Sequence, residues 1–287
     1  MTAPTLPPDP WQGTGTDPWM PKRLQRQAEI SVGEKTVYDG YFARLSAWLA
    51  LAGQAVMRGI VPNPDAVLNL APRWVRSMTD FTHTTIAELV GKSYLRVFGP
   101  GYKYDNRPFV TDYLARATNR LVDVPDQAYA LVVSQIAEGA SAGDSISTIA
   151  ERVRQSFDAT ATPYWASRPT VVARTETIGA LNAGRQGAFT EVQYDLGEQF
   201  EKGWLATMVG PTADRTRPTH RAADISTPIT GQRVPLDQPF IVGGFPGMFP
   251  GAPELPAHEA IQCRCTQLIL RPGEMVDLSD RQLEDFR

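Results

Sequence analysis

The sequence is poor in cysteine, in long apolar runs and in net charge. Its 287 residues include two cysteines, Cys263 and Cys265. A disulfide framework is therefore excluded, and a reducing compartment is expected. No stretch approaches the roughly 20 apolar residues of a membrane helix, because the best candidate, 45–57, is interrupted by Gly53 and Gln54. The N-terminal residues lack the basic and apolar regions of a signal peptide. We therefore expect synthesis in a cytoplasm and no membrane partner.

The formal net charge is −3, which argues against a module dedicated to gripping nucleic acid. Residues 71–120 are a local exception, with eight basic residues against four acidic ones. We favour a solvated helical surface for them and keep a weak, non-specific DNA contact as the alternative. The basic residues are Arg73, Arg76, Lys92, Arg96, Lys103, Arg107, Arg116 and Arg120, and the acidic ones are Asp80, Glu88, Asp105 and Asp112.

The distribution of proline and glycine predicts the organisation of the chain. Residues 1–21 contain six prolines, which indicates an extended arm that Trp11 and Trp19 could dock onto a surface. Residues 22–144 are predicted to be helical, and residues 145–273 form a mixed domain. The final residues, 274–287, are an acidic tail with one short helix.

Apolar spacing predicts most of the helices. Three glycines weaken the first pattern, which is therefore one helix or two, and Pro62 and Pro64 end it. Asp144 or Ser145 can cap the helix that follows them. The last helix is expected to begin near Arg168 and Pro169. The predicted helices cover 22–59, 73–98, 109–121, 126–139, 146–157 and 168–192.

Beyond Phe200 the sequence is dense in proline and glycine, which predicts short strands joined by long ordered loops. Strand-like composition occurs at 199–208, 234–242 and 263–270. The predicted class is therefore α+β: a helical N-terminal region followed by a small mixed α/β domain with long Pro/Gly-rich loops.

Polar residues gather in the segment from Asp214 to His220. Asp214 can cap a turn by accepting backbone N–H groups. Arg215 and Arg217 carry planar guanidinium groups that suit carboxylates and carbonyl clusters. His220 can serve as a ligand, a base or a hydrogen-bonding strut. We expect a structural network here.

Cys263 and Cys265 flank Arg264, and in a strand both thiols would point to the same face. With His220 they offer three zinc donors, and His258 or Asp214 would supply the fourth ligand of a closed site. The pair falls short of a full zinc motif, and small buried thiols also serve as ordinary packing. A structural zinc ion at this place is accordingly one of two interpretations.

The helical segment 173–176 reads Ala-Arg-Thr-Glu. Arg174 and Glu176 project about 200° apart and cannot pair within the helix. One of them should face inward or toward the C-terminal loops. We expect Arg174, Thr175 and Glu176 to anchor structure, with catalysis by Glu176 as a minority alternative.

In order and spacing, these elements together resemble the phage Mu protein F-like family of head morphogenesis proteins. The similarity covers about residues 145–270, and no single element is specific. The helical part 22–144 has no such signature. The matching positions are Arg174, Thr175, Glu176, Trp204, Asp214, Arg215, Thr216, Arg217, His220, Gly231, Phe240, Pro250, Gly251, Cys263, Arg264 and Cys265.

The resemblance implies a minor capsid protein of a tailed bacteriophage, present in few copies in the capsid interior or at the portal vertex. Its partners would be the portal, the major capsid protein or a scaffolding protein, and it would be ejected with the DNA in some phages. It implies no catalytic residue, so we do not expect an enzyme. The alternative is a metal-dependent hydrolase or toxin-type transferase using His220, Cys263, Cys265 and Glu176. A plain DNA-binding module is the weaker rival.

Overall fold

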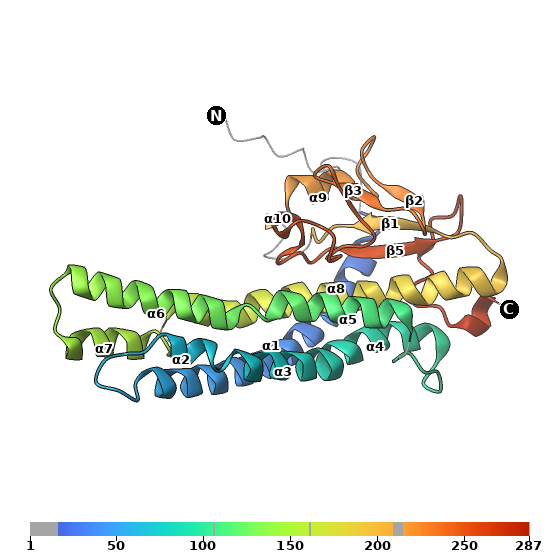
Figure 1. The fold of residues 1–287 in the computed structure, drawn as a ribbon. Coiled ribbons are helices and arrows are strands. Elements are labelled where there is room, and N and C mark those ends of the chain that lie inside the picture. The colour runs from blue at the N-terminus through green and yellow to red at the C-terminus, as the bar shows by residue number, and fades with distance from the viewer. Residues whose placement is uncertain (1–16, 106, 161, 209–214, 287) are drawn as a thin grey trace. The chain divides into compact units, whose positions relative to one another are not determined.

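The computed structural model describes residues 17–105, 107–160, 162–208 and 215–286, and over them the chain has the predicted α+β class. Helices fill the chain as far as Leu196, and the described strands follow it (Figure 1). The helical part comprises α1 (Met20–Val56), α2 (Asp65–Leu68), α3 (Ala71–Phe81), the π-helix η1 (Thr82–Ile86), α4 (Ala87–Phe98), α5 (Pro108–Leu121), α6 (Val124–Ser141), α7 (Ile146–Gln155) and α8 (Pro163–Leu196).

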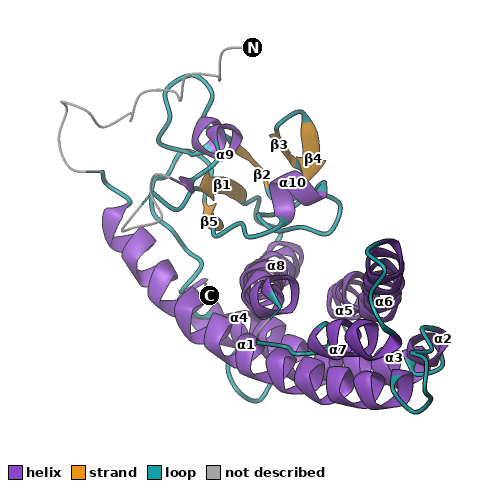
Figure 2. Cartoon of the chain, turned by 90° about the vertical axis from the view of Figure 1, so that its left-hand side faces the viewer, coloured by secondary structure: helices purple, strands orange, loops and turns teal. Residues whose placement is uncertain are grey.

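The remaining elements are short and lie between long loops. In chain order they are β1 (Glu201–Leu205), α9 (Pro218–Ala223), β2 (Arg233–Pro235), β3 (Phe240–Val242), β4 (Phe245–Gly247), α10 (Ala257–Ala260), β5 (Thr266–Leu270) and the 3-10 helix η3 (Leu283–Phe286). Figure 2 shows the strands gathered with α9 and α10. The predicted strand at 234–242 is two separate strands, and β4, α9 and α10 were not predicted.

Most helix boundaries follow the predicted signals. The prolines at 62 and 64 lie beyond the end of α1, and Gly99 ends α4 in a left-handed conformation at φ 86°. Of the two predicted caps of α7, Ser145 accepts the backbone N–H of Thr148 at 3.2 Å. The predicted helix 73–98 is interrupted by the π-turn η1, which its apolar spacing does not reveal.

Two helices are longer than predicted. Helix α1 runs unbroken through its glycines, and at Gly33 a Cβ atom would lie 2.6 Å from the Cγ2 atom of Thr177. Glycine is needed there because α1 and α8 approach so closely. Helix α8 begins at Pro163 rather than near 168, so Pro169 lies inside it. The buried Trp165 anchors this first turn through a 2.7 Å hydrogen bond to the Ser156 carbonyl.

The chain divides into two compact units that do not follow chain order. The first unit contains residues up to Lys35, Ile86–Tyr113 and everything from Arg174 onward, and the second contains Thr36–Thr85 and Leu114–Ala173. Because α1, α5 and α8 each contribute to both, the units cut across the predicted boundary between 144 and 145. The second unit is helical, and its core includes Trp74, which stacks edge-on against Tyr41 and Trp48 at 6.0 and 5.7 Å.

The first unit contains a three-stranded antiparallel sheet in the order β2-β1-β5. Lys202 pairs with Ile269 and Trp204 with Gln267, and β5 is buried along its whole length. Successive β5 side chains point to opposite faces, so Ile269 joins one apolar cluster while Leu268 and Leu270 join another. Both faces of the sheet are therefore covered.

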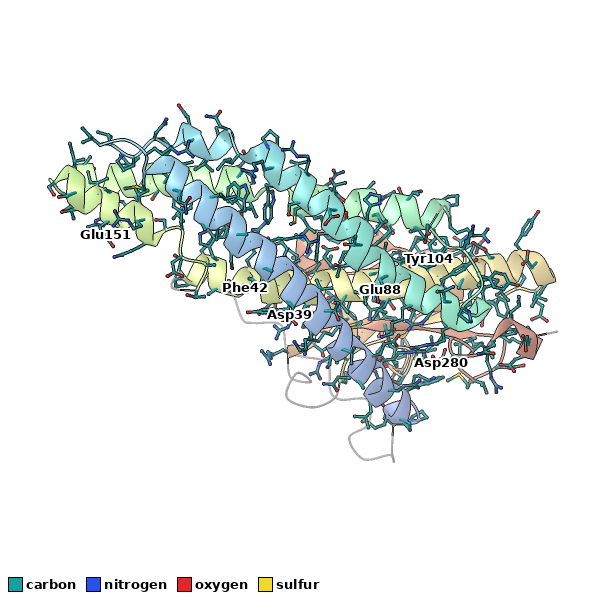
Figure 3. All side chains as sticks on the ribbon, turned by 90° about the horizontal axis from the view of Figure 1, so that it is seen from below. Asp39, Phe42, Glu88, Tyr104, Glu151 and Asp280 are labelled. Atoms are coloured by element: carbon teal, nitrogen blue, oxygen red, sulfur yellow. The ribbon has the colours of Figure 1, made fainter. Side chains whose placement is uncertain are left out.

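The described ends of the first unit bear on two expectations. The helix α1 begins at Met20, with Pro21 in its first turn, so the predicted arm ends before residue 20. Trp19 is buried against Leu205, while residues 1–16, including Trp11, lie outside the described part. The acidic C-terminal segment contains the short helix η3, in keeping with the predicted short helix, and it packs against the start of α1. Its Asp280 accepts hydrogen bonds from Lys22 and Arg26 at 2.7 and 3.0 Å (Figure 3).

Candidate metal centre

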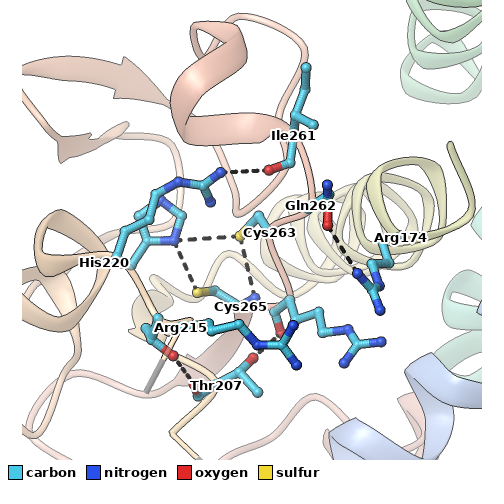
Figure 4. Close-up of a pocket in the computed structure, with 11 residues that line it drawn as sticks. Arg174, Thr207, Arg215, His220, Ile261, Gln262, Cys263 and Cys265 are labelled. Carbon is cyan, nitrogen blue, oxygen red and sulfur yellow. Dashed lines mark hydrogen bonds between the residues drawn. The ribbon is translucent and has the colours of Figure 1, made fainter. Parts of the chain in front are cut away.

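Two loop segments bring His220 and both cysteines together in the first unit (Figure 4). His220 projects from the short helix α9, which begins at Pro218. The cysteines were predicted to lie in a strand, but they lie in the irregular segment between α10 and β5. That segment does not extend β5 because the backbone N–H of Cys265 bonds the Cys263 sulfur at 3.3 Å instead of a strand partner.

The three donor atoms have spacings that suit a metal ion. The Nδ1 atom of His220 lies 3.3 Å from the sulfur of Cys265 and 3.6 Å from that of Cys263. All three side chains are buried, and their ligand atoms lie within 4.8 Å of one another. Zinc bonds of about 2.3 Å to sulfur and 2.0 Å to nitrogen in a tetrahedron place neighbouring donors roughly 3.5 Å apart. The donor set therefore fits zinc in chemistry and spacing and supplies three of its four ligands.

Glu259 sets the orientation of the His220 ring. A carboxylate oxygen of Glu259 lies 2.9 Å from Nε2 of His220 and accepts the Thr219 hydroxyl at the same distance. A proton on Nε2 leaves the Nδ1 lone pair directed at the thiols. Metal-bound histidines usually donate their second ring nitrogen to a carboxylate in this way. Glu259 is buried, and the motif spacing did not predict it.

Neither predicted fourth ligand joins the cluster in the described residues. The His258 side chain is 66% exposed, and its ring packs edge-on against Phe245 at 5.5 Å. It approaches the far oxygen of Glu259 rather than the thiols. Asp214 lies outside the described residues.

The protonation of the cluster is set by burial and by contact within it. Burial raises the pKa of Cys265 well above its usual value, and the hydrogen bond from Cys265 holds the pKa of Cys263 below its usual value. Burial alone would lower the pKa of His220, but the charge and hydrogen bond of Cys265 outweigh it, so that pKa is raised. A metal ion would replace these shared protons, since it binds the thiolate form.

The turn before Cys263 is strained and is clamped from α8. Gln262 adopts a left-handed backbone at φ 58°, which is uncommon for a residue with a side chain. Its N–H donates to the Thr175 hydroxyl at 3.1 Å, and its side-chain oxygen accepts from Arg174 at 2.9 Å. Two members of the Ala-Arg-Thr-Glu segment thus hold the conformation that aims Cys263 at His220.

Other motif residues brace the same segment. Arg217 donates to the carbonyl oxygen of Ile261 at 2.6 Å, and Arg264 makes a two-pronged ion pair with Glu34 of α1 at 2.9 and 2.6 Å. Trp204 of β1 packs edge-on against the His220 ring, with centroids 5.2 Å apart. These contacts give Arg174, Thr175, Trp204, Arg217, His220 and Arg264 places around one site.

Glu176 and Arg215 differ from the residues that brace the cysteine segment. Glu176 is buried on α8 and is not among the residues that line the cavity beside the cysteines. Its backbone carbonyl accepts the Tyr113 hydroxyl at 3.4 Å. Arg215 is exposed and faces that cavity (Figure 4). The geometry therefore associates Glu259, rather than Glu176, with the histidine.

Asn182 is a further site residue that the motifs did not reveal. From α8 it donates to the carbonyl oxygens of Pro250 and Cys265 at 2.9 and 3.2 Å, and so it ties the proline-glycine loop to the start of β5. Its position six residues after Glu176 gave no signal, because the partners come from loops whose path the sequence does not show.

A cavity of about 340 Å³ opens beside the cluster. His220, Cys263 and Cys265 form part of its wall, together with the four arginines at 174, 215, 217 and 264. A metal ion held by three protein donors would complete its tetrahedron with an exogenous ligand on the cavity side. The arrangement can thus hold a metal ion and a small anion next to each other.

The chain matches no protein-family model, no curated protein and no solved structure. No helix among the described residues is both long and apolar enough to cross a membrane.

Proposed function

We propose that this chain is a minor capsid or head morphogenesis protein of a tailed bacteriophage, as its motif series suggests. The observation that supports the proposal is the convergence of that series. Residues spread from Arg174 to Cys265 meet at one site, and most of them hold loop backbone rather than line up on a reacting group. Such an arrangement suits a module that must keep irregular loops fixed within an assembly.

We propose further that His220, Cys263 and Cys265 hold a structural zinc ion in this module. The loops around the site have few strand hydrogen bonds to fix them, and a metal cross-link between α9 and the segment before β5 would supply a firm constraint. Glu259 would orient the histidine. The ion would then act on folding and rigidity.

The location of the protein in a particle tests the phage assignment. Mature virions separated into heads, tails and released DNA should contain the chain in the head fraction at few copies, measured by quantitative mass spectrometry against the major capsid protein. A portal, capsid or scaffolding protein should co-purify with it. Its absence from mature heads and from procapsids would contradict the assignment.

A DNA contact through residues 71–120 remains a secondary proposal. Ion pairs reduce the charge that this stretch could offer, since Arg96 pairs with Glu29 at 3.1 Å and Arg107 with Glu191 at 3.5 Å. Binding to DNA would therefore be weak and would fall steeply as salt rises. Binding that ignores salt, or no binding at low salt, would end this proposal.

A metal-dependent hydrolase is the second candidate function, and the open cavity favours it. Catalytic zinc sites keep one position for water, whereas closed structural sites use four protein ligands. In such an enzyme the three donors would hold the metal, and the nearest carboxylate is Glu259 rather than Glu176. Turnover of phosphoester substrates by the zinc-loaded protein, abolished by His220→Ala, would support it, and zinc binding without turnover supports the structural role.

A further inference from the structure

We propose that the cavity beside the cysteines is a phosphate-binding site, in which Arg174, Arg215 and Arg217 hold the phosphate group of a nucleic acid or of a small phosphorylated molecule. The site is separate from the basic stretch 71–120. It goes beyond the structural role proposed above, because it assigns a ligand to a surface that bracing alone does not require.

The charges around the cavity are unbalanced. Its described lining residues include four arginines and no carboxylate. Arg264 is neutralised by Glu34, with oxygen-nitrogen distances of 2.9 and 2.6 Å. Arg174, Arg215 and Arg217 have no acid paired with them within 4.0 Å among the described residues. Among the described residues, three guanidinium groups therefore line one cavity of about 340 Å³ without a carboxylate in its wall.

Arg174 carries the strongest sign of a missing partner. Its Nε atom is buried and has no hydrogen-bond acceptor among the described residues, while Nη1 is bound to Gln262 at 2.9 Å. An unsatisfied donor of this kind costs free energy unless a ligand accepts from it. Burial, together with the nearby charges of Arg264 and Arg215, lowers the pKa of Arg174. An anion in the cavity would relieve both penalties.

The charge balance favours phosphate over carboxylate. A phosphate monoester carries about two negative charges near neutral pH and several acceptor oxygens. Each phosphodiester of a nucleic acid carries one charge, but its neighbours along the strand add more, whereas an isolated carboxylate carries one charge and two oxygens. Guanidinium forks match either geometry, but three of them leave an excess charge around a single carboxylate. A zinc ion bound to two thiolates adds no net charge, so the cavity stays positive whether or not the metal is bound.

Equilibrium binding to the purified full-length protein tests the proposal. Inorganic phosphate, a deoxynucleoside monophosphate, a short single-stranded DNA and acetate are titrated separately by calorimetry. Saturable binding of the phosphate-bearing probes, with acetate weak or silent, is the expected result. If the oligonucleotide binds far more tightly than the other two, a nucleic acid is the source of the phosphate, and comparable binding of all three indicates a free phosphate or nucleotide.

Substitution of the arginines locates the site. Arg215→Met removes an exposed side chain and should weaken phosphate binding roughly tenfold or more, as expected for loss of a charge-assisted contact. Arg174→Met should do the same. The control Arg58→Met removes one positive charge from an exposed position in the second unit, outside the basic stretch 71–120, and should leave binding unchanged. Circular dichroism and thermal unfolding establish that each variant is folded.

Three results would overturn the assignment. They are no saturable binding of any phosphate probe, equal loss of binding in Arg58→Met and Arg215→Met, and binding of acetate as tight as that of phosphate. The last would point to an acidic side chain of a protein partner instead. None of these results depends on whether the chain is found in phage heads, so the two proposals fail separately.

Discussion

Lys202 is a fully buried lysine in the middle of β1. Its ammonium donates to the Met248 carbonyl at 2.6 Å and lies over the Phe240 ring, 5.2 Å from the centroid. Burial lowers the pKa of Lys202 to about 7, although Asp237 and Glu254 oppose the shift. No acid bonds it directly among the described residues, so the neutral amine competes with the charged form near neutral pH.

The lowered pKa of Lys202 predicts that the stability of the fold depends on pH. Between pH 7 and 9.5 the unfolded chain keeps a proton on the lysine that the folded chain releases, so the free energy of unfolding should rise with pH. Lys202→Met should remove a rise on the order of 2 kcal/mol, measured by urea unfolding at several pH values. The comparison between the two proteins isolates this group, because other titrations are common to both. Parallel profiles would contradict the assigned burial.

Gln262 offers a second test at the level of one residue. Thr175→Val removes the hydroxyl that accepts its N–H and should cost about 1 kcal/mol of stability. Thr175→Ser keeps the acceptor and is the matched control. Gln262→Gly should recover part of the loss, because glycine adopts a positive φ without strain. Equal stability of the Val and Ser variants would show that the clamp contributes nothing.

At the scale of elements, the close approach of α1 to α8 at Gly33 is a packing constraint that substitution can test. Gly33→Ala would improve helix propensity by about 1 kcal/mol, yet the added methyl would lie 2.6 Å from the Thr177 Cγ2 atom. We expect the steric clash to outweigh the gain in helix propensity, so the free energy of unfolding measured by chemical denaturation should fall by about 1–2 kcal/mol. Thr177→Ser removes that methyl, so the double variant should regain most of the loss. If the double variant is no more stable than Gly33→Ala, this packing of α1 against α8 is contradicted.

The helices could be predicted because the apolar residues of each one recur with the helical period. Ser145, the prolines at 62 and 64, and Gly99 marked ends correctly, since caps and breakers act over a few residues. The π-turn at Thr82–Ile86 and the early start of α8 escaped, because apolar spacing does not distinguish a wider helical turn and Pro169 mimics a first-turn proline.

The candidate site was predicted in part. His220, Cys263 and Cys265 were predicted as candidate zinc ligands from their residue types alone, because few side chains bind zinc through nitrogen and sulfur. It placed the cysteines in a strand and offered His258 as a ligand, and both predictions were wrong. Glu259 and Asn182 escaped because their partners are set by tertiary contacts between loops.

Low pH should destabilise the first unit as a whole, because a buried ionic cluster joins its N-terminal and C-terminal segments. Arg26 bridges Glu29, Asp277 and Asp280 at 3.0 to 3.3 Å. Burial would raise the pKa of each of these acids, but the arginines around them lower it below the usual value. Their contribution is therefore present above about pH 4 and is lost as pH falls below it.

Thermal unfolding measured between pH 7 and pH 3 tests this contribution. The wild-type midpoint should fall steeply below about pH 4.5, and Asp277→Asn should show a lower midpoint at pH 7 together with a shallower fall. Asp65→Asn is the control, because that carboxylate lies in the second unit at the start of α2. A wild-type midpoint that is flat down to pH 3 would contradict the cluster.

The central claim for the whole molecule is that His220, Cys263 and Cys265 share one metal ion. The direct measurement is the zinc content of the purified protein by mass spectrometry, with thermal unfolding before and after chelation. We predict about one zinc ion per chain and a lower midpoint once it is removed. His220→Ala and Cys265→Ser should lose the ion, whereas His258→Ala should keep it. A chain that takes up no zinc after reconstitution, or that loses it equally in His258→Ala, would contradict the account.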